Sequence, residues 1–197
     1  LPMAAALIPD HPMAKTWMDV SGQYVRYKLA MNTAPGGAWS ELISYFGASA
    51  PHVMQAAMVL EGAGRLDERT ALLAAGPATF TLQLLTPPDP RFGARLVPGW
   101  GHEGTAGDTH WMPAAALMRS RDAELAKALA WAWDQAGRPM NSHHDAGFSE
   151  RAVAHADLLA DAGAGYVPPQ LRSVWMPGFG AVLRAHAGDP QETYLSY

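Results

Sequence analysis

The sequence predicts a mainly helical chain that passes into β-structure near its C-terminus. Up to about residue 162, apolar residues recur at helical spacing between Pro and Gly punctuation. After Pro168 and Pro169, the residues alternate with the two-residue period of strands. With 49% hydrophobic and 16% charged residues, a chain of 197 residues has a globular composition and the length to bury one sizeable core.

The charge and motif content exclude several functional classes. The 14 Lys and Arg residues against 18 Asp and Glu give a net charge of −4, which does not supply the basic face that a nucleic-acid binder needs. The absence of Cys excludes disulfides, thiol nucleophiles and thiolate metal sites. No apolar run approaches the roughly 20 residues that cross a bilayer. Phosphate-loop, dinucleotide and nucleophile-elbow motifs are also missing from the sequence.

Helices are predicted in the first half of the chain from their apolar periodicity. The expected segments are residues 1–8, 12–31, 51–62 and 67–85. The second segment has a stripe with spacings of four and three, formed by Met13, Trp17, Val20, Tyr24, Tyr27 and Met31. Ser49 is a plausible cap for the third segment. Gly76 and Pro77 are expected to kink or split the fourth, because proline removes a backbone donor.

A long loop, further helices and a β-hairpin are predicted in the second half. Residues 91–109 form the loop, which is rich in Gly and aromatic residues. Helices are expected over 113–118, 122–136 and 149–162, and strands over 174–176, 180–185 and 192–197. We therefore place a domain boundary at about residue 170, with a helical portion over 1–170 and the start of a β-domain over 171–197.

The first candidate site follows a Gly-Gly turn at 36–37. If the chain becomes helical from Trp39, then Glu41 and Tyr45 stand four residues apart on one face, where two side chains can converge on one ligand. A tyrosine hydroxyl can give a proton to a leaving oxygen. The alternative is that both aromatic residues pack in the core and that Glu41 is solvated.

The second candidate site is the loop over residues 98–111. It carries His102, Glu103, Asp108 and His110, with Trp100 and Trp111 nearby. Tryptophan rings beside ionisable groups suit sugar rings, because the apolar faces stack and the hydroxyls form hydrogen bonds. A metal site is a second interpretation, although the spacing is not a standard zinc pattern. A solvated structural loop is the third.

A polar cluster precedes the helix expected over 149–162. His143, His144 and Asp145 could hold a metal or carry protons, and the alternative is a polar turn with a helix cap.

Three segments, in this order, resemble the heparinase II/III-like polysaccharide lyases. The stretch Gly-Gly-Ala-Trp-Ser-Glu-Leu-Ile-Ser-Tyr at 36–45 resembles the Gly-Gly-Trp-x-Glu segment and tyrosine of that family. The run at 87–93, which leads to Pro98-Gly-Trp-Gly and Gly107-Asp108, is similar to the loop at the mouth of its helical toroid. The run 176–184 with Glu192-Thr-Tyr-Leu resembles the first hairpin of its β-domain. The resemblance implies an incomplete (α/α) toroid followed by an antiparallel β-sandwich.

The resemblance also implies a reaction and its residues. The reaction is β-elimination on an acidic polysaccharide such as alginate or a glycosaminoglycan, in a secreted or periplasmic protein. Tyr45 is implied as the acid, or as both acid and base, and His102 is a candidate for contact with the substrate carboxylate. Trp39, Glu41, Trp100 and His110 are the expected substrate contacts. No cofactor or metal is assigned to these residues, and a structural divalent metal would belong to the later part of the β-domain.

Two other functions remain open at this point. A glycoside hydrolase on a similar toroid would use two carboxylates, for which Glu41 with Glu103 or Asp108 could be offered. A carbohydrate-binding or scaffold protein would use the aromatic residues to bind sugar and would catalyse no reaction. Both chain ends suggest a piece of a longer protein. We therefore expect weak activity from the chain by itself, and self-association into homo-oligomers through the strand edge of the C-terminal hairpin.

Overall fold

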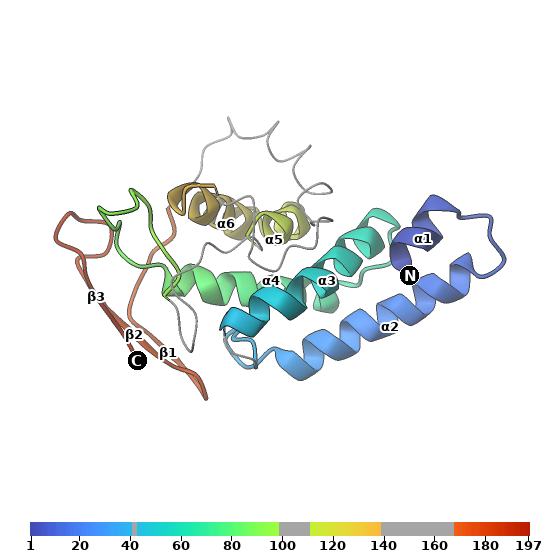
Figure 1. The fold of residues 1–197 in the computed structure, drawn as a ribbon, viewed down its shortest axis with the longest axis horizontal. Helices are drawn as coiled ribbons and strands as arrows, with labels where there is room; N and C mark the ends of the chain where they lie inside the picture. The colour runs from blue at the N-terminus through green and yellow to red at the C-terminus, as the bar shows by residue number, and fades with distance from the viewer. Residues whose placement is uncertain (41–42, 99–110, 139–167) are drawn as a thin grey trace.

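The computed structural model describes residues 1–40, 43–98, 111–138 and 168–197, without the side chains of 43–48 and 51. These residues form a mainly helical body with a small antiparallel sheet, and helix α1 and the sheet lie at opposite ends (Figure 1). The helices are α1 (Pro2–Leu7), α2 (Ala14–Asn32), α3 (Ile43–Gly62), α4 (Glu68–Leu84), α5 (Trp111–Met118) and α6 (Ala123–Gln135). The strands are β1 (Val174–Met176), β2 (Gly180–Ala185) and β3 (Thr193–Ser196). None of the described helices is both long and apolar enough to pass through a membrane.

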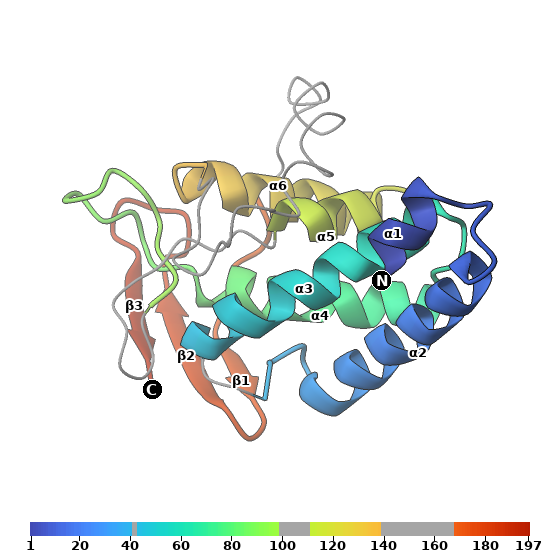
Figure 2. The ribbon, with the colours of Figure 1, turned by 45° about the vertical axis from the view of Figure 1, so that its right-hand side comes forward.

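Helix α4 forms the centre of the helical body. It packs against α2, α3, α5 and α6, and Figure 2 shows it between these helices. Its buried face is rich in alanine, with Ala71, Ala74 and Ala78 at most 1% exposed. Small side chains let several helices approach α4 closely, so any segment anchored on α4 is fixed relative to the whole core.

Helix α2 confirms the helix predicted over 12–31, but the face that it buries is not the apolar stripe of the sequence. The buried residues are Ala14, Met18, Ser21, Val25 and Leu29. Most of the predicted stripe faces solvent: Tyr24, Tyr27 and Met31 are 50%, 61% and 62% exposed. The helix has apolar residues of helical period on two faces, and the slimmer residues fit the close contact with α3 and α4. The stripe therefore indicated the helix correctly, although it does not mark the face that packs in the core.

Two prolines that were predicted to begin or interrupt helices lie inside them. Helix α3 begins at Ile43, eight residues before Pro51, so Ser49 is an interior residue and not a cap. Helix α4 runs without a break through Pro77, which is itself buried. An interior proline costs about 3 kcal/mol of helix stability. Because both helices bury many apolar positions in the core, packing outweighs that cost here.

The remaining described elements follow the prediction. The Asp67 and Asp122 side chains cap α4 and α6 by accepting hydrogen bonds from the backbone N–H groups of Thr70 (2.9 Å) and Leu125 (3.0 Å). The three predicted strands form a sheet of order β1-β2-β3 with antiparallel pairs. The helix expected over 149–162 lies outside the described residues.

The sheet packs against the helical body through a few buried side chains. Val182 and Met176 are 0% and 3% exposed, and both belong to the same hydrophobic core as α4. Phe179, in the turn between β1 and β2, packs edge to face against Phe80 of α4, with 4.7 Å between the ring centroids. The sheet and the helices therefore share one core.

Candidate functional site

The Gly-Gly turn before α3 is held tightly against α4. The Ser40 backbone N–H donates to the carbonyl of Asn32 (2.7 Å), which closes the loop that contains the turn. Gly36 and Gly37 have φ values of +87° and +89°, a region that disfavours residues with a side chain. A Cβ atom on Gly37 would lie 2.3 Å from the carbonyl oxygen of Gly76 in α4. Only glycine at this position allows the two backbones to touch.

The two glycines of the turn provide a matched pair of variants. Gly37→Ala is expected to cost about 1–3 kcal/mol more stability than Gly36→Ala, because only the alanine at 37 meets backbone atoms. Both variants share the penalty of a positive φ, which is roughly 1–2 kcal/mol. Urea unfolding of the two variants measures this difference. Equal midpoints for the two would show that the turn is not packed on α4.

Trp39 lies in the core beside this turn. It is 3% exposed and borders a small cavity together with Ala74 and Pro77 of α4 and Val53 of α3. The predicted stacking of Trp39 on a sugar requires a ring face that the structure keeps covered. In the described arrangement this side chain fixes the chain just before α3.

The other predicted site residues fall mostly outside the described parts of the chain. Tyr45 is the third residue of α3, so its backbone position is known, but its side chain is not among those described. Glu41, Trp100, His102 and His110 lie outside the described residues, as do Glu103, Asp108, His143, His144 and Asp145. The proposed roles of Tyr45 and His102 and the expected substrate contacts of Glu41, Trp100 and His110 therefore stay predictions, whereas Trp39 is buried.

Trp111 anchors the end of the long loop on the same part of α4. Its side chain is fully buried, and its indole N–H donates to the carbonyl of Ala78 (3.2 Å). The turn before α3 contacts α4 at Gly76, and Trp39 lies beside Ala74 and Pro77. The chain segments that lead to Tyr45 and away from residues 99–110 are thus both fixed to one stretch of α4, residues 74–78.

The beginning of the long loop is fixed by backbone contacts around Arg95. Its backbone N–H donates to the carbonyl of Gln135 at the end of α6 (2.8 Å), and its guanidinium donates to the carbonyl of Thr86 (2.9 Å). The N–H of Leu96 donates to the Thr86 hydroxyl (3.0 Å). The chain is therefore held in place before residue 99 as well as at Trp111.

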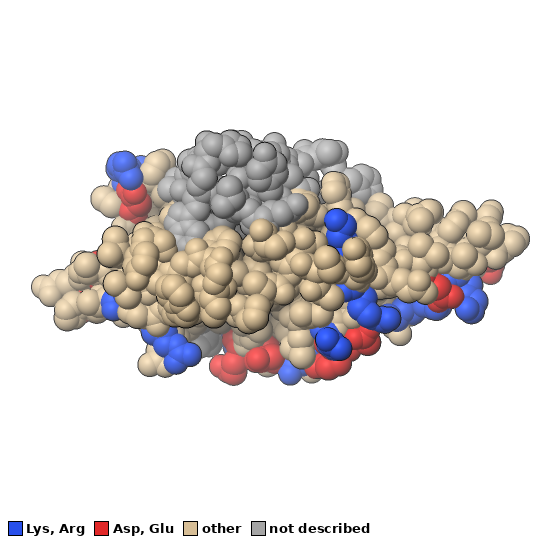
Figure 3. All heavy atoms as spheres, turned by 90° about the horizontal axis from the view of Figure 1, so that it is seen from below, with Lys and Arg blue, Asp and Glu red and all other residues tan. Residues whose placement is uncertain are grey.

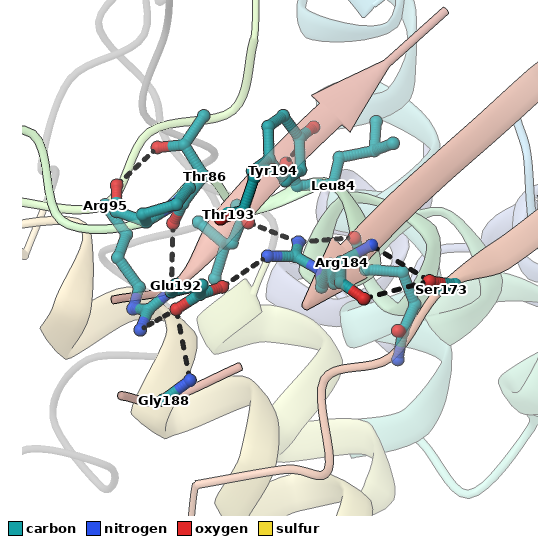
Figure 4. Close-up of polar contacts among 12 residues, drawn as sticks. Leu84, Thr86, Arg95, Ser173, Arg184, Gly188, Glu192, Thr193 and Tyr194 are labelled. Carbon is teal, nitrogen blue, oxygen red and sulfur yellow. Dashed lines mark hydrogen bonds and ion pairs between the residues drawn. The ribbon is translucent and has the colours of Figure 1, made fainter. Parts of the chain in front are cut away.

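A buried ionic cluster joins this segment to the sheet (Figure 4). The two carboxylate oxygens of Glu192 accept from Arg95 (2.9 Å) and Arg184 (2.8 Å), and one of them also accepts from the N–H of Gly188 (3.1 Å). The side chains of Glu192, Arg184 and Arg95 are only 1%, 1% and 6% exposed. One carboxylate thus compensates two buried guanidinium groups.

Arg184 of this cluster and the neighbouring Tyr194 also donate hydrogen bonds to the carbonyl groups at the end of α4. Arg184 donates to the carbonyls of Gln83 (2.8 Å) and Leu85, and the Tyr194 hydroxyl donates to the carbonyl of Leu84 (2.9 Å). The last carbonyls of a helix have no partner inside the helix, and they carry partial negative charge that favours a nearby cation. Side chains of the sheet therefore cap α4.

The charges in the cluster alter one another's pKa values. Burial alone would raise the pKa of the Glu192 carboxyl, but the hydrogen bonds from Arg95 and Gly188 and the two arginine charges outweigh it, so the pKa lies below its usual range. Burial lowers the pKa of Arg184, and the Glu192 carboxylate offsets part of that effect. Arginine remains charged at ordinary pH, so the cluster needs an ionised Glu192.

Sequence reasoning noted Arg184 and Glu192 only as part of a strand pattern and missed this cluster. The available signal was Arg184, a charged residue among the apolar residues of β2. Arg95 offered no signal, because its partner lies 97 residues away.

The described residues contain no group of three or more His, Asp and Glu side chains that could hold a metal ion. Comparison of the chain with protein-family models, with curated proteins and with solved structures finds no match.

Proposed function

We propose that this chain carries the tyrosine-containing helical part of a polysaccharide lyase that cleaves a uronate-containing polysaccharide by β-elimination. The proposal takes the helical body as part of an incomplete (α/α) toroid and the sheet as the start of a β-sandwich domain. A mainly helical body that passes into an antiparallel sheet at Val174 supports it, because the motifs place these two parts in that order.

The observation that carries the proposal is the shared anchoring on residues 74–78 of α4. Gly37 and Trp39 fix the approach to Tyr45 there, and Trp111 fixes the end of the 99–110 segment there. The segment that bears Tyr45 therefore starts from residues 74–78 of α4, and the segment 99–110 ends at the same residues. This supports a single groove between them, on a rigid support of the kind that catalysis needs.

The proposed chemistry assigns one proton transfer to Tyr45. A base removes the proton on C5 of the uronate, a double bond forms between C4 and C5, and the bond from C4 to the bridging oxygen breaks. The Tyr45 hydroxyl gives its proton to that departing oxygen. Neutralisation of the uronate carboxylate stabilises the charge that develops on C5, and His102 is the proposed contact for this carboxylate. Glu41, Trp100 and His110 are proposed to hold neighbouring sugar units.

A product assay tests the proposal. The native protein is incubated with alginate, heparan sulfate and hyaluronan, and ultraviolet absorbance of an unsaturated uronate end is recorded. We expect this absorbance to rise with at least one polymer. Alginate whose carboxyl groups have been reduced to alcohols is the control, because its C5 proton is not activated. New reducing ends without absorbance would indicate a hydrolase, and binding without products would indicate a carbohydrate-binding protein.

A further inference from the structure

We propose that the outward face of α2 is the interface between two copies of this chain. The face, which we call the α2 seam, consists of Met13, Val20, Tyr24, Tyr27 and Met31. Each of these side chains is between 44% and 62% exposed, although all are large and apolar or aromatic. In Figure 1, α2 lies along the outside of the helical body. A helix that is apolar on two faces is typical of a position between two packed layers.

The spacing of the seam indicates that its partner is a helix. With the half-buried Trp17 included, the positions are separated by 4, 3, 4, 3 and 4 residues, a repeat of seven. This repeat keeps an apolar line facing a second helix along its whole length. The face that α2 buries inside the molecule is a separate set of residues, so the seam remains open to a partner.

Most charges of α2 lie away from the seam and are paired within the chain; Lys28, four residues after Tyr24, is the exception. Asp19 accepts from Lys15 (2.8 Å) and from Arg65, and Arg26 donates to Asp67 (2.9 Å). Seen from the side on which α2 lies, uncharged residues form a broad band and most charged side chains gather toward one edge (Figure 3). A second copy would therefore meet an apolar line with one neighbouring lysine, whose long side chain can keep its charge in water at the rim of the interface.

A hollow beside the seam can accept a ring from the second copy. It has a volume of about 430 Å³, lies between α1, α2 and α3, and is bordered by Val20 and Tyr24 of the seam. Gln55 also lines it, and the side-chain nitrogen of Gln55 has no hydrogen-bond partner among the described residues. A tyrosine of the second copy fits both features, because its ring fills an apolar hollow and its hydroxyl accepts a hydrogen bond.

The exposed area of the seam favours a second copy over a larger, permanent assembly. Five half-exposed side chains offer roughly 450 Å² per copy, and the rim of the hollow brings the total for two copies to roughly 1,200 Å², the lower end of specific interfaces. A twofold axis lets the same seam serve on both copies. We therefore expect a reversible dimer with a dissociation constant of roughly 1–100 μM.

Sedimentation equilibrium of the 197-residue chain over a range of concentrations tests the dimer. The variant Tyr24→Gln/Tyr27→Gln/Met31→Gln is expected to weaken association at least roughly 100-fold, because it removes three interface side chains. Two controls are Leu72→Gln on α4, where Leu72 is as exposed as Tyr24, and Leu195→Thr in the sheet. Both controls are expected to dimerise like the parent chain. Circular dichroism verifies that each variant is folded.

Disulfide cross-linking gives an independent measurement, because the chain has no cysteine of its own. Under mild oxidation, at least one of Val20→Cys, Tyr24→Cys and Tyr27→Cys is expected to form a covalent dimer rapidly, while Leu72→Cys is not. A chain that stays monomeric to roughly 1 mM, about tenfold above the expected range, would overturn the proposal. Dimers that persist in the triple variant but disappear in Leu195→Thr would also overturn it, in favour of pairing through the strand edge.

Discussion

The variant Glu192→Gln is expected to lower the free energy of unfolding by about 3–5 kcal/mol, the usual cost of removing one partner from a buried ion pair. Glutamine has nearly the same shape, so the loss is one of charge. Arg184 and Arg95 would then face each other in the core without a compensating carboxylate. Because Arg184 also caps α4, we expect the loss to loosen the contact between sheet and helices.

The matched control is Glu124→Gln. Glu124 pairs with Lys127 at 3.1 Å, but its side chain is 76% exposed. Exposed pairs contribute about 0–1 kcal/mol, so this variant is expected to unfold at nearly the parent denaturant concentration. Equal effects of the two substitutions would show that the buried cluster does not hold the fold together.

Because the pKa of Glu192 is lowered in the folded state, the stabilisation that the cluster contributes depends on pH. The unfolded state binds a proton at Glu192 more readily than the folded state, so the stabilisation is complete above the unfolded pKa of roughly 4.3. It is lost as the pH falls through the lower folded pKa. The stability difference between the parent chain and Glu192→Gln should therefore be constant near neutrality and shrink below about pH 4. A difference that grew in acid would contradict the pKa assignment.

The variant Tyr45→Phe in the native protein is expected to reduce turnover by about 10²–10⁴-fold, the usual contribution of a general acid or base. Only the hydroxyl is lost, so the ring remains and the affinity for the polysaccharide should change little. Turnover and binding are measured separately, from the absorbance of unsaturated product and from calorimetric titration with oligosaccharide.

Tyr197→Phe serves as the control for hydroxyl removal, because Tyr197 is 67% exposed and lies just after β3, outside the two segments proposed to form the groove. This control is expected to keep full activity. If Tyr45→Phe retained more than roughly a tenth of the parent turnover, Tyr45 would not be the proton donor.

Elements with strong local signals were predictable from the sequence. Asp67 and Asp122 begin α4 and α6 as caps, and the three strands lie where the sequence predicted them. The core face of α2 was not predictable, because its two apolar faces have the same period and only packing chooses between them. The passage of α4 through Pro77 also depends on packing, since the local cost of proline favours a break.

The candidate site was predictable to a smaller extent. The motif at 36–45 correctly drew attention to the Gly-Gly turn, but the contact of Gly37 with Gly76 that gives the turn its rigidity joins residues far apart in the sequence. The burial of Trp39 likewise arises from α3 and α4 and not from its own segment. Pairing of Glu192 with Arg95 across 97 residues leaves no local pattern at all.

The origin of the oxygen atoms in the products tests the proposed lyase reaction most directly. The native protein is allowed to cleave its polysaccharide in water enriched in heavy oxygen, and the products are weighed by mass spectrometry. Elimination breaks the bond between C4 and the bridging oxygen without consuming water, so we expect unsaturated products that contain no heavy oxygen from cleavage after correction for exchange at the reducing end. Saturated products that gain one water per cut, with the heavy isotope incorporated, would show hydrolysis and contradict the proposed function.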